Sequence, residues 1–382
     1  MLPQQHHYKM QQSKNYKIVI SGGGTGGHIF PAISIANAIK EIEPTTEILF
    51  VGANDRMEMQ RVPDEGYPIK GLPIAGFYRK KMWKNFSVLI KIVRSLSIAK
   101  KIIKEFKPDV VVGVGGYASG PTLKVASSLQ IPTLIQEQNS YAGLTNKLLA
   151  KKADKICVAY EGMERFFPKD KIVFTGNPVR QQLITPFKSK SEAIATFGLQ
   201  KEIPTVLILG GSLGAQSINE AILHQLDTIR SAKVQFIWQT GKLYYERITN
   251  ELNRHKKLPN LIVMDFIKDM KAAYTVADLL VSRSGAGSIS EFCLLGKPVI
   301  LVPSPNVAED HQTQNALALV EKDAAILVKD DAAKRDLVLT AIETIADQER
   351  LTTLQKNIQK LAKPNAAKEI AEEVLALIKK TN

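Results

Sequence analysis

Glycine-rich turns that follow short apolar strands are the parts of this sequence best suited to chemistry. Two of them, KIVISGGGTGGH (Lys17–His28) and TVLILGGSLGA (Thr205–Ala215), run from an apolar strand towards a helix start. Each half of the chain then has a second such turn, VVVGVGGYASGP (Val110–Pro121) and LLVSRSGAGSISE (Leu279–Glu291). Free backbone N–H groups and the helix dipole at such a turn form an anion site. Four turns in two matched pairs predict two nucleotide-type domains whose substrates carry phosphate.

A glycine-rich turn can also serve only to reverse the chain, or it can hold a dinucleotide. A simple reversal does not need the five glycines found in the seven residues of Gly22–His28. The spacing Gly22-x-Gly24-x-x-Gly27 fits the dinucleotide fingerprint, which also needs an acid at the end of the second strand. That strand, EILFVGAND, reaches an acid only after the turn, at Asp55. A nicotinamide or flavin enzyme is therefore disfavoured, and a P-loop is excluded because no Gly-Lys-Ser/Thr follows.

Apolar runs alternate with helical patterns along both halves of the chain. Short β-branched runs predict strands at 18–20, 48–51, 110–114, 133–136, 155–158, 172–175, 206–209, 235–239, 261–264, 279–281, 299–302 and 325–328. Helical patterns between them are clearest at 33–41, 88–105 and 142–150. Such alternation is typical of an α/β fold with a parallel sheet covered by helices on both faces. The pattern stops at Gly176–Gln200, a turn-rich and then polar connection, and restarts after it.

A length of 382 residues predicts about two domains. We expect a disordered tail at 1–16, an N-terminal domain at 17–180 and a C-terminal domain at 181–364. A helix at 365–382, beyond Pro364, is expected to cross back and pack on the N-terminal domain. Cys157 and Cys293 show no metal or disulfide spacing, which indicates reduced thiols of a cytosolic protein. The polar start has no signal-peptide core, and no run approaches the ~20 apolar residues of a membrane span.

The net charge of +14 indicates an anionic partner. Between Gly76 and Lys107 there are ten basic residues and one acid, so this segment carries most of the excess. Its cations are interleaved with aliphatic residues at helical spacing and not with a stacking aromatic platform, which disfavours nucleic acid. The stretch RKKMWKNF combines cations with aromatic rings and predicts docking to an anionic membrane surface. The residues expected to form this membrane patch are Arg79, Lys80, Lys81, Trp83 and Lys84.

Seven blocks in order carry a family resemblance: GGGTGGHIFPA, GVGGYASGP, QEQN, GNPVR, GGSLGA, RSGAGSISE and EDHQTQNA. From about residue 17 to its end the chain resembles the MurG glycosyltransferases. The resemblance implies the GT-B architecture, two Rossmann-like domains facing across a cleft. It also implies an inverting transfer of N-acetylglucosamine (GlcNAc) from UDP-GlcNAc to undecaprenyl-diphospho-N-acetylmuramoyl-pentapeptide, in peptidoglycan synthesis. The enzyme would lie on the cytoplasmic face of the cell membrane as a peripheral protein and could meet other cell-wall synthesis proteins.

The same resemblance implies roles for individual residues. Glu291 would accept hydrogen bonds from the ribose hydroxyls, Ile267 would hold uracil through its backbone, and Gln312 would contact the sugar. The family's usual Gln-Gln pair near the sugar is His311-Gln312 in this chain. The full donor set is Thr25, Gly26, Gly27, Asn139, Arg180, Ser212, Ile267, Ser284, Gly285, Ala286, Glu291 and Gln312. A second diphosphate site, for the acceptor, is expected at Gly23, Gly24, Gly115, Gly116, Tyr117 and Ser119.

Glycosyl transfer from a nucleoside diphosphate needs a base for the acceptor hydroxyl and stabilisation of the leaving diphosphate. Many transferases bind a divalent metal with Asp-x-Asp, and this pattern occurs nowhere in the sequence. We therefore expect no metal and no cofactor, and we expect backbone amides and helix dipoles to stabilise the charge. His28, beside the first anion site, is the expected general base. Two alternatives stay open: another GT-B transferase or epimerase with a different acceptor, and a basic nucleic-acid-binding module.

Overall fold

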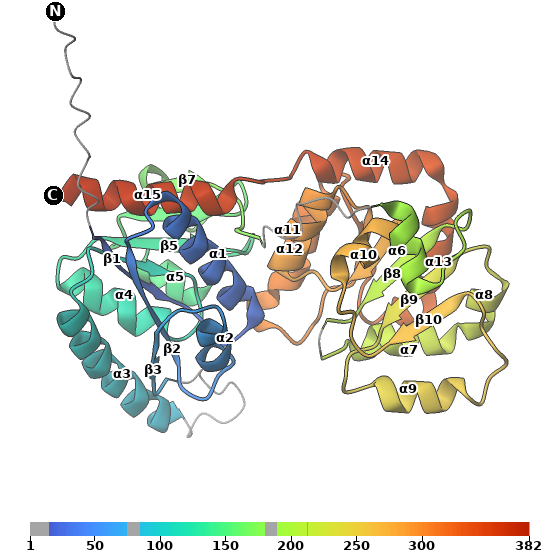
Figure 1. The fold of residues 1–382 in the computed structure, drawn as a ribbon, viewed down its shortest axis with the longest axis horizontal. Helices are drawn as coiled ribbons and strands as arrows, with labels where there is room; N and C mark the ends of the chain where they lie inside the picture. The colour runs from blue at the N-terminus through green and yellow to red at the C-terminus, as the bar shows by residue number, and fades with distance from the viewer. Residues whose placement is uncertain (1–14, 75–84, 180–188, 212, 382) are drawn as a thin grey trace, which may run out of the picture. The chain divides into compact units, whose positions relative to one another are not determined.

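The computed structural model describes residues 15–74, 85–179, 189–211 and 213–381. These residues form two compact units (Figure 1). The first unit takes in the chain up to Gln136, Leu144–Cys157 and the chain from Ala367 on, and the second takes in Glu137–Gly143 and Val158–Ala366. The positions expected for the membrane patch, and most of the expected N-terminal tail, lie outside the described residues.

The first sheet has seven strands in the order β3-β2-β1-β4-β5-β6-β7. The pairings of β3 with β2, β2 with β1, β1 with β4 and β4 with β5 are parallel. The chain adds β2 and β3 on one side of β1 and then returns to add β4 on its other side, so the strand order reverses between β1 and β4. The strands are β1 (Lys17–Ser21), β2 (Glu47–Ala53), β3 (Ile69–Leu72), β4 (Val110–Gly113), β5 (Thr133–Glu137), β6 (Lys155–Val158) and β7 (Ile172–Phe174).

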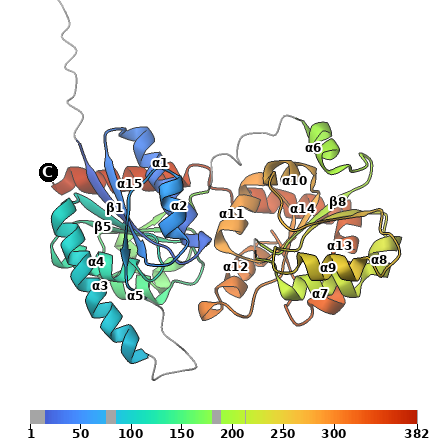
Figure 2. The same cartoon turned by 60° about the horizontal axis from the view of Figure 1, so that its bottom comes forward.

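Helices cover both faces of this first sheet (Figure 2). Helices α1 and α2 pack together on one face, and α3, α4 and α5 pack in series on the other. The last helix, α15, buries Ile370, Val374 and Ile378 and forms an ion pair between Glu373 and Lys155 of β6. The helices are α1 (Gly26–Ile42), α2 (Glu58–Asp64), α3 (Asn85–Phe106), α4 (Ser119–Ser128), α5 (Leu144–Leu149) and α15 (Ala366–Thr381).

The second sheet repeats the same plan with six strands, in the order β10-β9-β8-β11-β12-β13, and all its pairings are parallel. Its strands are β8 (Thr205–Leu209), β9 (Gln235–Gln239), β10 (Leu261–Met264), β11 (Leu279–Ser282), β12 (Val299–Leu301) and β13 (Ile326–Leu327). Its order reverses between β8 and β11. In such sheets ligands bind at the carboxyl ends of the strands beside the reversal.

Nine α-helices are described in the second unit. They are α6 (Lys190–Phe197), α7 (Gln216–His224), α8 (Leu226–Ser231), α9 (Tyr245–Leu252), α10 (Met270–Val276), α11 (Ala286–Leu295), α12 (His311–Val320), α13 (Ala333–Ala346) and α14 (Gln348–Gln359). Contacts between α13 and α7 and between α10 and α6 tie neighbouring helices together. The prediction of two Rossmann-like α/β domains is confirmed.

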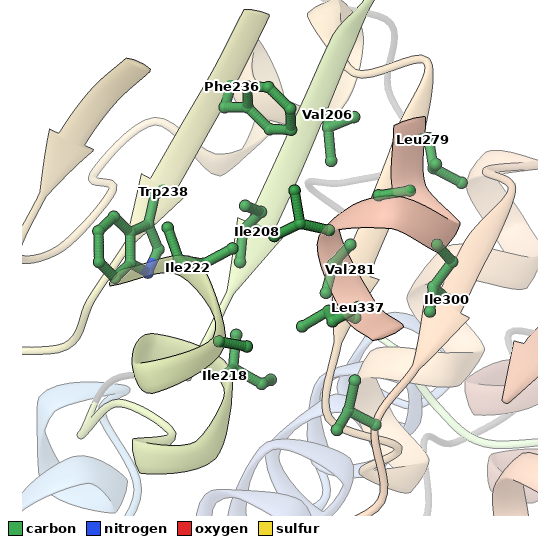
Figure 3. Packing of buried hydrophobic residues seen from close by; sticks show 14 of the residues in the cluster. Val206, Ile208, Ile218, Ile222, Phe236, Trp238, Leu279, Val281, Ile300 and Leu337 are labelled. Atoms are coloured by element: carbon green, nitrogen blue, oxygen red, sulfur yellow. The ribbon is translucent and has the colours of Figure 1, made fainter. Parts of the chain in front are cut away.

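Alternating side chains of the central strands fill two separate cores in the second unit. Val206 and Ile208 of β8 point into the core drawn in Figure 3, where they meet Phe236 and Trp238 of β9. Leu207, one residue along, belongs to the core on the opposite face. This alternation follows from the two-residue period of a strand, and burial of each such large side chain contributes about 1.5–3 kcal/mol. Because both faces are buried, the strands read as continuous apolar runs.

Three aspartates each bind the backbone amide at the start of a strand in one of the two sheets. Asp109 accepts a hydrogen bond from the Lys17 amide at the start of β1, with N and O 2.7 Å apart. Asp154 does the same for Thr133 of β5 at 2.7 Å, and Asp278 for Thr205 of β8 at 2.9 Å. In each pair the aspartate immediately precedes a strand of the same sheet. These charge-assisted bonds fix the strand starts at the edge away from the glycine turns.

The structure departs from the expected elements in a few places. Strand β3 was not expected, because Ile69–Leu72 contains Lys70 and Gly71 and shows no β-branched run. Helix α1 begins at Gly26, well before the expected start, and tolerates Pro31 within it. Both cysteines are buried, and neither forms a disulfide within the described part of the chain. Within the described ranges no helix combines the length and apolar character needed to cross a bilayer, and no group of acidic, His or Cys side chains could hold a metal.

Candidate functional site

The first glycine turn places an uncapped helix start at the carboxyl end of β1. Gly23 and Gly24 have φ values of 147° and 86°, which favour glycine. Thr25 is the N-cap of α1 but caps it with no side-chain hydrogen bond, and the first turn holds no acid. The amides of Gly26 and Gly27, in that first turn, have no intrahelical acceptor because of their position. The turn therefore directs N–H groups and the positive end of a helix dipole outwards.

The second glycine turn of this unit packs directly on the first. A Cβ added at Gly116, which has a φ of 81°, would lie 2.2 Å from the Gly23 carbonyl oxygen. Ser119 is buried, and its hydroxyl donates to the carbonyls of Ser21, at 2.7 Å, and Gly115, at 2.8 Å. Tyr117 between them is about half exposed. The two turns are thus a single built surface at the ends of β1 and β4.

His28 lies in the first turn of α1, partly exposed. Its Nδ1 is 3.2 Å from the Thr25 hydroxyl oxygen. This contact relates the imidazole to the N-cap residue and sets the ring beside the glycine turn. The structure therefore brings Thr25, Gly26, Gly27 and His28 together with the two turns that contain all six residues expected for the acceptor diphosphate.

A buried acid lies under the first turn. Glu58, the first residue of α2, is 1% exposed. Its two carboxylate oxygens accept hydrogen bonds from the amides of Gly24, at 2.9 Å, and Ala53, at 3.0 Å. The Gly24 amide is therefore already used within the protein.

In the second unit one glutamine joins the glycine turn to the expected uracil residue. The Gln239 side chain donates to the Gly211 carbonyl at 3.0 Å and accepts from the Ile267 amide at 2.8 Å. Gly214 and Gly241 meet backbone to backbone, since a Cβ at Gly241 would lie 2.1 Å from the Gly214 nitrogen. The turn after β8 and the loop after β10 are consequently held together at the carboxyl edge of the sheet.

The turn after β11 offers a second uncapped helix start. Gly285 is the N-cap of α11 without a side-chain cap, Ala286 is the first helical residue, and the first turn holds no acid. Ser284 is completely buried, and its hydroxyl has no hydrogen-bond partner among the described residues. Glu291, further along α11, accepts a hydrogen bond from the Tyr274 hydroxyl at 3.2 Å. The same helix thus combines an uncapped start, a geometry that suits an anion, with a carboxylate that can accept hydrogen bonds.

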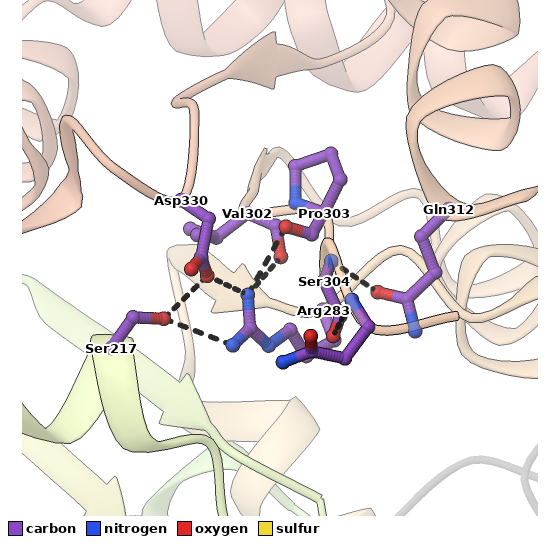
Figure 4. A network of polar contacts seen from close by, with 8 residues as sticks. Ser217, Arg283, Val302, Pro303, Ser304, Gln312 and Asp330 are labelled. Atoms are coloured by element: carbon purple, nitrogen blue, oxygen red, sulfur yellow. Dashed lines mark hydrogen bonds and ion pairs between the residues drawn. The ribbon is translucent and has the colours of Figure 1, made fainter. Parts of the chain in front are cut away.

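Arg283 braces the loops around this turn (Figure 4). Its guanidinium donates to the carbonyls of Val302 and Pro303, at 3.0 and 3.2 Å, and pairs with Asp330. It also donates to the Ser217 hydroxyl at 2.9 Å, and this hydroxyl in turn donates to Asp330. Because its donors face these groups, Arg283 acts as a brace between α7, β12 and the chain after β13.

Gln312 extends this arrangement to the first turn of α12. Its side-chain oxygen accepts a hydrogen bond from the Ser304 amide at 2.9 Å, next to the carbonyls that Arg283 holds (Figure 4). The oxygen is thereby committed to the backbone, so the amide NH₂ of Gln312 is the group left to meet a ligand. Sugar hydroxyls, with their lone pairs, are suitable acceptors for it.

Asparagines fix the segment Glu137–Gly143 of the second unit, which contains most of the QEQN block. Asn315 of α12 is buried, and its side chain accepts from the Ser140 amide at 2.9 Å and donates to Asn139 at 3.1 Å and to the Ser284 carbonyl at 3.3 Å. Asn177 donates to the Gln138 carbonyl at 3.0 Å and to the Ser290 hydroxyl at 3.1 Å. Asn139, expected on the N-terminal side, thus belongs to Glu137–Gly143 of the second unit.

Residue-by-residue reading of the sequence missed Glu58, Gln239, Arg283, Asn177 and Asn315. Three of them lie inside quoted motif blocks, so the motifs marked their neighbourhood without showing what each side chain contacts. Gln239 and Glu58 lie outside every block, and nothing local marks them. Arg180 and Ser212, both expected in the donor set, lie outside the described residues.

Comparison with known proteins shows the family to which the chain belongs. The model of the glycosyltransferase family 28 N-terminal domain matches residues 18–158, and that of its C-terminal domain matches residues 205–374. The UDP-N-acetylglucosamine–N-acetylmuramyl-(pentapeptide) pyrophosphoryl-undecaprenol N-acetylglucosamine transferase of Bacteroides fragilis is 63% identical over 370 residues, covering 97% of each chain.

Solved structures show the same fold. The crystal structure of Acinetobacter baumannii MurG has a TM-score of 0.76 and 28% identity, covering 94% of this chain and 99% of that one. A Neisseria meningitidis UDP-GlcNAc 2-epimerase bound to UDP-GlcNAc has a TM-score of 0.66 at 17% identity, covering 95% and 100%, and shares the fold alone. The chain belongs to glycosyltransferase family 28 and, within it, to the MurG N-acetylglucosamine transferases.

Proposed function

We propose that this chain transfers GlcNAc from UDP-GlcNAc to the 4-hydroxyl of undecaprenyl-diphospho-N-acetylmuramoyl-pentapeptide, with inversion at the anomeric carbon. The observation that carries the proposal is the 63% identity, over nearly the whole of both chains, with a transferase named for this reaction. The two pairs of glycine turns support it, because a nucleotide-sugar donor and a lipid diphosphate acceptor both need anion sites.

The second unit would hold the donor. The uncapped start of α11, at Ser284, Gly285 and Ala286, would face the diphosphate and stabilise the charge that develops when UDP leaves. Ile267 would hold uracil through its backbone, and Glu291 would accept hydrogen bonds from the ribose. Sequence alone adds Arg180 and Ser212 to this set. The chain has no Asp-x-Asp, so we propose that backbone amides stabilise the leaving group without a bound metal.

The first unit would hold the acceptor. His28 would take the proton from the 4-hydroxyl as that oxygen attacks the anomeric carbon of GlcNAc. The bond from this carbon to the phosphate oxygen would break on the opposite face, and UDP would leave with the electron pair. A proton moves from the hydroxyl to the imidazole, so the step needs no further reactant.

A transfer assay with radiolabelled UDP-GlcNAc tests the function directly. We expect label to appear in a lipid-linked disaccharide when the lipid-diphosphate muramoyl-pentapeptide is supplied. Label in product with an acceptor that lacks the lipid, at an equal rate, would favour another GT-B transferase. Conversion of UDP-GlcNAc to its 2-epimer without any acceptor would instead favour an epimerase.

Glu291→Gln is expected to raise the Kd for UDP-GlcNAc by roughly 10–100-fold, since hydrogen bonds to a charged group contribute about 1.5–3 kcal/mol. Isothermal titration calorimetry measures the change. Glu343→Gln, an exposed acid on α13, is the matched control and should leave the Kd unchanged. Unchanged binding in a folded Glu291→Gln protein would show that Glu291 does not contact the ribose.

The acceptor's lipid requires the enzyme to reach a bilayer, and we propose docking to the cytoplasmic face of the membrane. On α3 the side chains of Leu89, Ile90 and Val93 are more than half exposed, among the exposed cations Lys91 and Arg94, which supports such docking.

Salt-sensitive sedimentation with anionic vesicles measures this docking. Binding should be lost when Lys80, Lys81, Trp83 and Lys84 are replaced together by neutral polar residues, because each cation near an anionic surface contributes about 1 kcal/mol. Vesicles of neutral lipid are the control. Equal sedimentation of the variant and the parent at low salt would place the docking surface elsewhere.

A further inference from the structure

Glu58 is a buried carboxylate that nothing in the proposed reaction uses. It is 1% exposed and lies at the start of α2, which follows β2. Burial of a charge is costly unless hydrogen bonds compensate it. Here the compensation comes from two backbone amides, those of Gly24 at 2.9 Å and Ala53 at 3.0 Å. One amide belongs to the first glycine turn and the other to the end of β2.

Two glycines make room for this side chain. A Cβ added at Gly23 would lie 2.1 Å from a Glu58 carboxylate oxygen, and one at Gly52 would lie 2.6 Å from its Cγ. Gly23 is also the residue against which Gly116 packs. Glu58 therefore requires a glycine at position 23, and the backbone of Gly23 in turn requires a glycine at position 116. The first turn is built around the carboxylate.

We propose that Glu58 is a positioning residue for the acceptor side of the site, an inference that rests on the proposed function. By holding the Gly24 amide, it fixes the backbone that leads into Thr25 and the start of α1. His28 and the amides of Gly26 and Gly27 are thereby set in place before the acceptor binds. Because the Gly24 amide is used and a carboxylate lies behind it, the acceptor's diphosphate is met by the first turn of α1 and not by Gly24.

Glu58→Gln tests the proposal with almost no change in shape. The glutamine oxygen can accept one of the two amides, but its NH₂ then faces the other as donor against donor. We expect kcat/KM for the lipid-linked acceptor to fall at least tenfold, with the Kd for UDP-GlcNAc within twofold of the parent. Asp109→Asn is the matched control, since Asp109 binds the Lys17 amide of the same unit at the other end of β1. It should lower the Tm without this loss of acceptor use.

Other results would overturn the proposal. Acceptor kcat/KM within twofold of the parent would show that Glu58 sets nothing the reaction needs. If Asp109→Asn has the same Tm as Glu58→Gln and the same loss of acceptor kcat/KM, the role of Glu58 is structural only. The same conclusion follows if Glu58→Gln weakens UDP-GlcNAc binding as much as it lowers acceptor kcat/KM. Should Glu58→Gln fail to fold, Gly52→Ala decides, because its methyl would displace the Glu58 side chain and should produce the same acceptor-selective loss. An inactive parent protein would contradict the proposed function instead.

Discussion

Replacing His28 by glutamine is expected to lower kcat for glycosyl transfer by about 10²–10⁴-fold, the usual contribution of a positioned general base. Glutamine keeps a polar side chain of similar reach at the start of α1, so the Thr25 contact at this position can be replaced. It cannot take a proton from the acceptor hydroxyl. The measurement is kcat at saturating acceptor and donor, together with calorimetric binding of UDP-GlcNAc, which should stay within twofold.

A second histidine serves as the control for this substitution. His255, three residues beyond the end of α9, lies beside Glu251 and outside all four glycine turns. His255→Gln should therefore keep full activity. If His28→Gln keeps more than a tenth of the parent kcat, the base is another residue and the assignment fails.

Gly116→Ala is expected to remove at least 99% of the transfer activity. Its methyl group would lie 2.2 Å from the Gly23 carbonyl oxygen and 3.0 Å from the Gly23 nitrogen, and both are backbone atoms that cannot rotate away. The two turns must separate, and the start of α1 moves with them. A non-glycine residue at a φ of 81° adds about 1–3 kcal/mol of backbone strain. Transfer rate and the Tm of the first unit are the measurements.

Gly66→Ala separates the collision from the strain. Gly66 has a φ of 83°, and an added Cβ would meet nothing within 4 Å. Both variants should show a similar strain, but only Gly116→Ala should lose activity beyond what its stability explains. Equal activity in the two variants would mean that close packing of the turns is not needed for transfer.

The strands that build both sheets could be predicted because burial on two faces leaves a continuous apolar run. Strand β3 could not, since Lys70 and Gly71 interrupt it and its pairing with β2 supplies what its side chains do not. A Cβ at Gly71 would lie 1.9 Å from the Asn54 side-chain oxygen, so the glycine is required by a contact with a residue distant in sequence. The pattern of apolar and polar residues around a strand cannot predict such a contact.

The same limit applies to the site. The sequence marks the glycine turns, but it does not show that Gln239 links two of the loops or that Asn315 links Ser284 to Asn139. The missing acid after the second strand is the clearest case. The sequence places Asp55 just after the second strand. The acid that reaches the first glycine turn is instead Glu58, three residues later, because it begins α2 and accepts a hydrogen bond from the Gly24 amide. Its carboxylate binds the backbone amides of Gly24 and Ala53, whereas the acid of the dinucleotide fingerprint binds a ribose.

The chain leaves the first unit after Cys157 and returns to it only at Ala367, so the ribosome makes the last part of this unit after most of the second one. Helix α15 belongs to the first unit, yet Val158–Ala366 must be made before it emerges. At about 5–20 residues per second, those 209 residues take roughly 10–40 s. During that interval the nascent first unit exposes the apolar surface that Ile370, Val374 and Ile378 later cover. Val158–Ala366 is one continuous segment of the second unit and contains all strands of the second sheet. The second sheet can therefore form before the first unit is completed by α15.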